Sequence, residues 1–384
     1  MSIPYDFEKP IDRRGTASVK WDKYRERDTI PMWVADMDFR SPPAVIQALH
    51  SRVEHGIFGY THAPDALVET VLRRLKDRYR WKVESEWLVW LPGLVTGINV
   101  TCRAVGEDGD AVLTNIPVYP PFLSAPENNR RTLTTFPLIK SDNRWHFNFD
   151  RMEKAITPDT HLFLLCSPHN PAGRVFSIEE LGRLAAICER HDIVICSDEI
   201  HCDLVLDEDK KHIPTATLNP EVARRTITLM APSKTYNIPG LGCSFAIIPD
   251  EGLRQRFQKA MAGIVPHVNA LGYTAALAAF RDGQEWLDAL LNVLRNNRDQ
   301  VAQTINDTPG LSMTHVEATY LAWIDTREAN LDNPARFFEE AGVGLSDGQD
   351  FGGNGFVRLN FGCPRATLSE ALNRIQRAMS SLDL

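Results

Sequence analysis

The sequence predicts an α/β protein in which a large domain, built on a mainly parallel sheet of seven strands, carries a smaller α+β domain. Short apolar runs alternate with helix-like segments between residues 87 and 248, which is typical of parallel strands joined by crossover helices. After Tyr273 the pattern changes to a long helical stretch, and beyond Pro309-Gly310 strand and helix signals are mixed. With 384 residues and 43% hydrophobic content, the chain is long enough to bury a large core.

The central part of the chain is predicted to be one α/β domain. Seven apolar runs are expected to form the strands of its sheet: 87–91, 110–114, 132–138, 161–166, 193–197, 226–230 and 244–248. The segment 177–191 is expected to be one of the intervening helices. It opens on the capping box Ser177-Ile-Glu-Glu180, and apolar residues then recur at helical spacing.

The last third of the chain predicts the smaller domain. Its long helical stretch carries an apolar stripe at Trp286, Leu287, Leu290, Leu291 and Leu294. Strands are expected at 320–324 and 356–361, and the capping box Thr367-Leu-Ser-Glu370 predicts the start of a final helix. The first forty residues show no clean period and are expected to fold onto this part. The predicted domains are therefore 46–280 for the large one, and 1–45 together with 281–384 for the small one.

Composition limits the classes of function. The net charge is −8 and no long basic run occurs, so nucleic acid and anionic membranes are not expected partners. No run of about 18 apolar residues is present, and the N-terminus lacks the apolar region of a secretion signal. The seven cysteines are odd in number and form no C-x-x-C, which indicates neither a disulfide framework nor a zinc site. We therefore expect a soluble cytoplasmic protein without a metal.

Lys234 is the central candidate for a functional residue. It lies in the polar turn 231–237, where Ser233 precedes it, directly after the apolar run 226–230. A lysine alone is usually a solvated surface charge, but the carboxyl end of a buried strand is where open parallel sheets bind ligands. Asp198 ends the preceding predicted strand and Asn170 follows the one before it, although each alone is more typical of a cap or a turn. Three such strand ends can converge on one ligand.

These three residue types match the needs of pyridoxal 5'-phosphate (PLP). The amine of Lys234 can condense with the cofactor aldehyde, and the carboxylate of Asp198 can keep the pyridine nitrogen protonated. The amide of Asn170 can donate to the ring oxygen. No Ser/His/Asp triad, Walker loop or zinc spacing competes for the site. The sequence thus predicts a PLP-dependent enzyme that acts on amino acids.

Further residues fit this interpretation, and each has an ordinary structural alternative. Val95 and Thr96 lie where a strand gives way to a helix, so their backbone N–H groups can hold a phosphate, although such junctions are often only packing. Arg358 lies inside an apolar run with period two. Its side chain is expected on an exposed edge, or against an acid, or on the carboxylate of a substrate. Tyr119 can stack on a pyridine ring.

Four aromatic residues complete the candidates. Tyr60 lies in a glycine-bearing segment where an exposed tyrosine can serve an interface. Trp33, Trp323 and Tyr320 are candidates for lining the substrate pocket, and core packing is the stronger expectation for each.

The chain resembles the MalY/PatB branch of the fold-type I PLP-dependent enzymes, the family of cystathionine β-lyases or C–S lyases. The resemblance covers essentially the whole chain and is carried by these phrases: Phe58-Gly-Tyr-Thr-His62, Pro168-His-Asn-Pro-Ala-Gly-Arg174, Ser197-Asp-Glu-Ile-His-Cys-Asp203, Ala231-Pro-Ser-Lys-Thr-Tyr-Asn237 and Arg358-Leu-Asn-Phe-Gly-Cys363. It implies that Lys234 bonds to PLP and shuttles protons, and that Arg358 binds the substrate carboxylate. The other cofactor-binding residues that it implies are Val95, Thr96, Tyr119, Asn170, Asp198, His201 and Ser233, with Tyr60 reaching a phosphate, and the substrate, across a homodimer interface.

Two positions depart from the pattern of aminotransferases. His201 stands where aminotransferases place a tyrosine that donates to the ring oxygen, and Gly242 stands where many have a phosphate-binding arginine. The resemblance therefore implies α,β-elimination of L-cystathionine or related L-cysteine S-conjugates to pyruvate, ammonia and a thiol such as homocysteine. A class I/II aminotransferase remains the alternative, since it needs the same base, electron sink and carboxylate clamp. A regulatory protein that binds a transcription factor is the alternative from another class.

Overall fold

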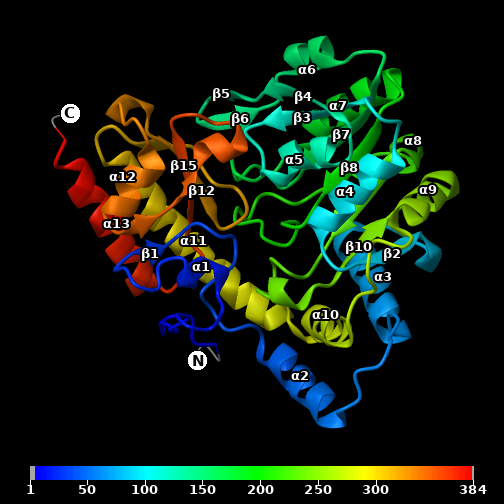
Figure 1. Cartoon of the computed structure of the whole chain (residues 1–384), viewed down its shortest axis with the longest axis horizontal. Helices are drawn as coiled ribbons and strands as arrows, with labels where there is room; N and C mark the ends of the chain where they lie inside the picture. The colour runs from blue at the N-terminus through cyan, green and yellow to red at the C-terminus, as the bar shows by residue number, and fades with distance from the viewer. Residues whose placement is uncertain (1–4, 383–384) are drawn as a thin grey trace.

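The computed structural model describes residues 5–382, and its largest element is the predicted seven-stranded sheet (Figure 1). In spatial order its strands are β2 (Leu88–Leu91), β10 (Ser244–Ile247), β9 (Thr226–Met230), β8 (Val194–Asp198), β7 (Thr160–Cys166), β3 (Ala111–Ile116) and β4 (Thr132–Pro137). The pairs from β9 to β4 are parallel, and β10 runs antiparallel to both of its neighbours. The predicted fold class and all seven predicted strands are confirmed.

Helices cover both faces of this sheet, because successive side chains of each buried strand point to opposite faces. The helices packed around the sheet are α3 (Asp65–Tyr79), α4 (Leu94–Ala104), α5 (Pro121–Asn128), α6 (Phe149–Ala155), α7 (Ile178–Arg190), α8 (Pro220–Arg224) and α9 (Glu251–Met261). Leu162 and Leu164 of β7 belong to a core with α4 and α9, whereas Phe163 and Leu165 belong to a second core with α7. The capping box that opens α7 is confirmed: Ser177 Oγ accepts from Glu180 N, and Glu180 accepts from Ser177 N.

A second, four-stranded antiparallel sheet forms the core of the C-terminal part. Its order is β11 (Ser312–Met313), β12 (Leu321–Asp325), β15 (Phe356–Asn360) and β14 (Ser346–Asp347). The helices of this part are α11 (Gln284–Asn306), α12 (Pro334–Glu340) and α13 (Arg365–Met379), and α10 (Ala270–Asp282) precedes them. In Figure 1 the 23-residue α11 runs diagonally from α10 into the part of the molecule that holds β12 and β15. The two predicted strands and the apolar stripe of α11 are confirmed.

The predicted start of the last helix is wrong. Helix α13 begins at Arg365 after Pro364, two residues before the proposed capping box, and Thr367 therefore lies within its first turn. Pro364 is the N-cap, and its carbonyl oxygen accepts from Leu368 N at 3.1 Å, so the helix begins without a side-chain cap.

The N-terminal segment lies against the C-terminal part. Strand β1 (Ile30–Pro31) pairs in parallel with β13 (Val343–Gly344), and the short α1 (Val19–Asp22) precedes it. Buried Phe7, Met32 and Met37 join the core formed by α11, α13 and β12. Helix α2 (Pro43–His55) then leads back toward the large sheet and packs on α10. Sequence reasoning did not find α2, α3 or the hairpin of β5 (Ile139–Ser141) and β6 (Arg144–His146). The division into two domains stays a prediction.

Candidate active site

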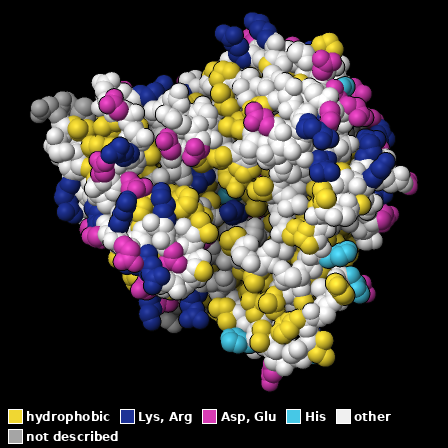
Figure 2. Space-filling model, viewed as in Figure 1, with side chains coloured by type: hydrophobic (Ala, Val, Ile, Leu, Met, Phe, Trp, Pro, Cys, Tyr) yellow, Lys and Arg dark blue, Asp and Glu magenta, His cyan; other side chains and the backbone are white. Residues whose placement is uncertain are grey.

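A cavity opens at the carboxyl ends of the parallel strands, where the sequence predicted the site. It is lined by the start of α4, the ends of β7 and β8, and the loop between β9 and β10. Figure 2 shows a hollow near the centre of the viewed face, bordered by hydrophobic side chains and containing a Lys or Arg side chain. Eight of the predicted residues line this one cavity: Val95, Thr96, Tyr119, Asn170, Asp198, His201, Ser233 and Lys234.

A second cavity of about 530 Å³ adjoins the first. Tyr119, Lys234 and Ala35 line both, and the second is closed on the other side by α12 and by the segment 345–351. Arg358 lines only the second cavity. The two cavities thus form a continuous site, with the lysine where they meet.

Lys234 is held in the tight turn that follows β9. Backbone bonds from Tyr236 N to Pro232 O and from Ile238 N to Ser233 O, both 3.0 Å, close this turn around it. The amine donates to the carbonyl oxygen of Ala35 at 2.5 Å. Burial and the nearby Arg358 together lower the pKa of Lys234 to about 8, although Asp36 and Asp198 favour the ammonium form. A lysine with a pKa near the working pH is suited to act as a base.

Asp198 is the last residue of β8 and its carboxyl group is buried in the first cavity. Ile200 N donates to its Oδ1 at 3.1 Å, and the backbone is fixed by Ser167 N, which donates to Asp198 O at 3.0 Å. Burial raises the pKa of this carboxyl to about 7, although Lys234 and the Ile200 amide favour the ionised form. A cationic ring N–H placed against Asp198 would keep it ionised.

Arg358 lies in β15 and is 4% exposed, in neither of the two structural settings that the sequence suggested. Strand β15 is flanked by β12 and β14, so it is not an edge strand, and no carboxylate within residues 5–382 pairs with this guanidinium. Its partners are Asn170 Oδ1 at 3.1 Å, Trp33 O at 2.8 Å and Ser346 Oγ at 3.2 Å.

The guanidinium of Arg358 therefore has unused binding capacity. Its Nε has no partner among the described residues. Burial lowers its pKa to about 10. A buried cation without a counter-charge is costly, and a ligand carboxylate would supply that charge. The bond from Arg358 also fixes the orientation of the Asn170 amide, which leaves Nδ2 as the donor available to a ligand.

The start of α4 provides a site for an anion. Gly93 is the N-cap and offers no side-chain oxygen, so the first N–H groups of this 11-residue helix have no side-chain cap. Val95 and Thr96 in this first turn face the same cavity as the hydroxyl-bearing Ser233. A phosphate at a helix N-terminus is stabilised by such N–H groups and by the helix dipole.

Gly242 also lines this cavity and lies against Pro92, just before the start of α4. Its φ is +57°, and a Cβ added to it would lie 3.1 Å from Pro92 O. Both constraints oppose an arginine at this position.

His201 and Tyr119 form the remaining walls. His201 is buried and its pKa is lowered to about 3 by burial and by Lys234 and Arg358, so its ring is neutral. The Nδ1 of His201 has no partner among residues 5–382. Tyr119 N donates to Asn170 O at 3.1 Å, and burial raises the pKa of its phenol.

Tyr60 lines neither cavity, unlike the other residues predicted to bind the cofactor or the substrate carboxylate. It lies between α2 and α3 with its side chain fully exposed, next to the exposed Ile57 and Phe58. Core packing is confirmed for Tyr320 and Trp323. It is wrong for Trp33, which is half-buried and lines the second cavity.

Sequence reasoning missed the residues that reach the site from the N-terminal segment and from the second sheet. Ala35 lines both cavities, and Ser346 holds Arg358. Neither Ala35 nor Ser346 belongs to a motif whose residue type or spacing would indicate a role in binding or catalysis. The only local signal was the unpatterned run Pro31–Asp38, whose polarity does not follow any regular period.

The residues present fit PLP. A buried carboxyl suits the ring nitrogen, an oriented amide suits the ring oxygen, a lysine suits the aldehyde, and an uncapped helix start suits the phosphate. The fold, with this site at the carboxyl edge of its large sheet, is that of the fold-type I PLP-dependent enzymes.

The chain belongs to the aminotransferase class I and II family, whose model matches residues 27–375. Cystathionine beta-lyase PatB of Bacillus subtilis (strain 168) is 39% identical, over 98% of this chain and 100% of that protein. The crystal structure of OvoB is 48% identical with a TM-score of 0.96, covering 98% of this chain and 100% of that chain. Cystalysin from Treponema denticola, which contains a pyridoxal 5'-phosphate cofactor, is 32% identical with a TM-score of 0.94, covering 98% and 99%. The predicted resemblance to the MalY/PatB branch is confirmed.

Other kinds of site find no support in residues 5–382. No group of His, Cys, Asp and Glu in this range has the arrangement of a metal site. No helix there is long and apolar enough to cross a membrane. All seven cysteines are buried and none is in a disulfide.

Proposed function

We propose that this chain is a PLP-dependent C–S β-lyase that eliminates the sulfur substituent of L-cystathionine or a related L-cysteine conjugate. The observation that carries the proposal is the juxtaposition of Lys234 with Arg358, which line the same cavity. A base and a carboxylate-binding cation at one site can hold an α-amino acid with its Cα–H bond toward the base. Two relatives support the proposal: PatB is a cystathionine beta-lyase, and cystalysin contains a pyridoxal 5'-phosphate cofactor.

Each cofactor-facing residue has a role that its environment supports. Asp198 binds the ring N–H, Asn170 donates to the ring oxygen, and Tyr119 packs on the ring face. Val95, Thr96 and Ser233 bind the phosphate. His201 lies beside Lys234 as a neutral ring, so it adds no charge to the site.

The chain's own groups then perform the elimination. Arg358 binds the substrate carboxylate, and the freed amine of Lys234 takes the proton from Cα. PLP, when bound, supplies the electron sink that accepts the Cα electron pair. As the Cβ–S bond breaks, its electron pair leaves with sulfur. The protonated Lys234, for which Ala35 O is the acceptor, can then return the proton to the leaving thiolate. Released aminoacrylate is hydrolysed to pyruvate and ammonia.

The test is pyruvate formation from L-cystathionine by the PLP-loaded protein with no keto acid present. We expect pyruvate and free thiol in equal amounts. Absence of both, with the absorption of bound PLP still changing on addition of amino acids, would assign the chain to the aminotransferases instead. The matched control is Lys234→Ala, which should yield neither product.

An aminotransferase is the second candidate, because the family match includes that activity and the same three groups would serve it. His201 and Gly242 are the positions that favour the lyase. That the protein binds a transcription factor stays a prediction.

We also propose that the protein acts as a homodimer in which Tyr60 completes the partner's site. The exposed run that contains Ile57, Phe58 and Tyr60 supports this, since clustered apolar side chains favour an interface. Mixing Tyr60→Ala with Lys234→Ala chains tests it. In the hybrid dimer one site has both residues intact, so activity should return. An active monomer by light scattering, or a hybrid with no recovery, would contradict the proposal.

A further inference from the structure

The backbone segment Trp33–Asp38, here called the strap, contacts both key cations of the site. Ala35 O accepts from Lys234 Nζ at 2.5 Å, and Trp33 O accepts from Arg358 at 2.8 Å. Tyr320 also donates its hydroxyl to Ala35 O at 2.9 Å. The position of the strap therefore determines where the side chains of Lys234 and Arg358 find their hydrogen-bond acceptors.

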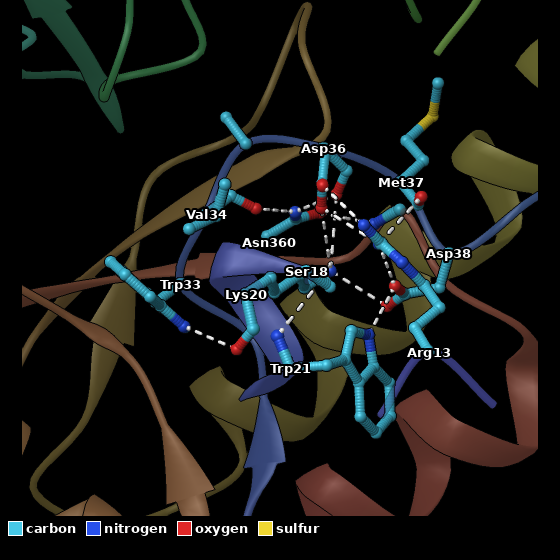
Figure 3. Close-up of polar contacts among 12 residues, drawn as sticks. Arg13, Ser18, Lys20, Trp21, Trp33, Val34, Asp36, Met37, Asp38 and Asn360 are labelled. Carbon is cyan, nitrogen blue, oxygen red and sulfur yellow. Dashed lines mark hydrogen bonds and ion pairs between the residues drawn. The ribbon is translucent and has the colours of Figure 1, made fainter. Parts of the chain in front are cut away.

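A buried ion cluster holds the strap from the side of the N-terminal segment. Lys20 is 0% exposed and its Nζ lies 2.8 Å from Asp38 Oδ2 and 3.2 Å from Asp36 O. Arg13 bonds both carboxylates, at 2.7 Å to Asp36 and 2.6 Å to Asp38. Trp21 Nε1 adds a bond of 2.8 Å to Asp38. Figure 3 shows these side chains converging on the two aspartates.

Asparagine side chains hold the strap from two other directions. Asn360 of β15 donates to Val34 O at 2.5 Å and to Asp36 O at 2.7 Å, as Figure 3 also shows. Asn237, three residues after Lys234, accepts from Met37 N at 2.9 Å and donates to Met37 O at 2.8 Å. Two cations and two carboxylates balance, so the cluster fixes the strap without leaving a net buried charge.

The groups that face Lys234 explain why this placement has a chemical effect. Arg358 from β15 disfavours the ammonium form, whereas Asp36 of the strap and Asp198 of β8 favour it, and burial lowers the pKa to about 8. A carbonyl acceptor also favours the ammonium form, because it accepts a hydrogen bond from the charged amine. Neutral His201 completes the surroundings.

We propose that Asp36 and Asp38 are positioning residues for the reaction: through the strap they place the Ala35 carbonyl as the acceptor for Lys234 whenever its amine is not bonded to the cofactor. The inference rests on the proposed function, since it assigns this acceptor to the base of the elimination. It adds that the N-terminal cluster sets the protonation of Lys234, although the cations of the cluster, Lys20 and Arg13, do not contact Lys234 themselves.

The experiment follows covalent capture of PLP by the apoprotein as a function of pH, through the absorption of bound PLP. Capture needs the neutral amine, so its pH midpoint reports the protonation of Lys234. The variants are Asp36→Asn and Asp38→Asn, with Asp325→Asn as the matched control. Asp325 is a buried carboxylate that pairs with Arg327 at 2.6 Å in the second sheet and lines neither cavity. Because all samples use the same PLP, titration of the cofactor itself cancels when the pH midpoints of the variants are compared with that of the wild type.

We expect both strap variants to shift the midpoint downward by about 0.5 to 1 pH unit, since the ammonium form loses its acceptor. The control should not shift. If only Asp36→Asn shifts the pH midpoint of PLP capture, and Asp38→Asn does not, the charge of Asp36 acts directly on Lys234 and positioning by the cluster is refuted. Equal shifts in the control would refute it as well.

A milder variant keeps the proposal testable if the strap variants do not fold. Tyr320→Phe removes the competing donor to Ala35 O and leaves the cluster intact, so the midpoint should move upward. An unchanged midpoint would show that this carbonyl does not set the protonation of Lys234. Failure of the wild-type apoprotein to capture PLP would instead refute the proposed function, so the two failures are distinguishable.

Discussion

The molecule buries charge in two neighbouring regions in opposite ways. In the N-terminal cluster, Asp38 is met by Lys20, Arg13 and Trp21 at 2.6–2.8 Å. In the cavity, Arg358 is equally buried but has no carboxylate, and the pKa of Asp198 is raised to about 7 by burial.

The difference separates structure from function. Buried charges that satisfy one another are costly to break and serve to hold the chain. Buried charges whose partners are missing are tolerated where a ligand supplies them. The cluster therefore determines the position of the strap, and the cavity depends on a cofactor and a substrate.

Loss of Lys234 should have the largest effect. Lys234→Ala is expected to lower pyruvate formation by about 10³-fold or more, because a positioned base contributes roughly 10²–10⁴-fold. Steady-state assays with L-cystathionine measure this. Lys211→Ala, which changes an exposed lysine, should keep the wild-type rate. Substantial elimination by Lys234→Ala would place the base elsewhere.

Breaking the cluster should cost the most stability. Lys20→Met removes the fully buried one of the two cations that pair with Asp38 and leaves only Arg13, so it is expected to lower the free energy of unfolding by about 3–5 kcal/mol. Urea unfolding measures it. Lys23→Met is the comparison, since the Lys23–Glu339 pair at 3.2 Å is partly exposed and contributes about 0–1 kcal/mol. Similar small losses of unfolding free energy in both variants would show that the buried cluster holds the chain no better than a partly exposed ion pair does.

Loss of Arg358 should lower catalytic activity strongly and stability only slightly. Arg358→Met is expected to lower kcat/KM by about 10²-fold, because the substrate carboxylate loses its partner. The free energy of unfolding should stay within about 1 kcal/mol of wild type, since three lost hydrogen bonds are offset by relief of an unpaired buried cation. A loss as large as that of Lys20→Met would show that Arg358 is structural.

The pH dependence of stability should report on Asp198. Its pKa rises from 3.8 in the unfolded chain to about 7 in the fold, so the folded apoprotein binds more protons between these values. Its contribution is therefore fully present below pH 4 and is lost as the pH rises to 7, on the order of a few kcal/mol. Urea unfolding of wild type and Asp198→Asn at pH 5 and 7 measures it. The variant should lack this decline, and equal slopes would contradict the raised pKa.

His201→Tyr should have the smallest effect, a severalfold rise in transamination relative to elimination. A tyrosine there would place a hydroxyl donor near the ring oxygen in place of the neutral imidazole of His201, which has one N–H donor. The ratio of keto-acid-dependent amino transfer to pyruvate release measures the change. An unchanged ratio would remove His201 as the residue that separates the two activities.

Much of the cavity could be predicted because its residues follow strands. Lys234, Asp198 and Asn170 each come after an apolar run, and parallel strands bring their carboxyl ends to one edge. The setting of Arg358 was missed because its neighbours come from β12, β14 and the strap. The start of α13 was misplaced because Pro364 begins the helix in place of the side-chain cap.

The sequence by itself determined the seven strands of the large sheet and the chemistry present at the strand ends, because hydrophobic periodicity and residue type are local properties. Only the tertiary structure decided what surrounds that chemistry. Ala35 lies 199 positions from Lys234 and Trp33 lies 325 positions from Arg358, and contacts at such separations leave no local pattern. The shifted pKa values of Lys234 and Asp198 follow from burial in the assembled fold, so the tertiary structure was needed to show them.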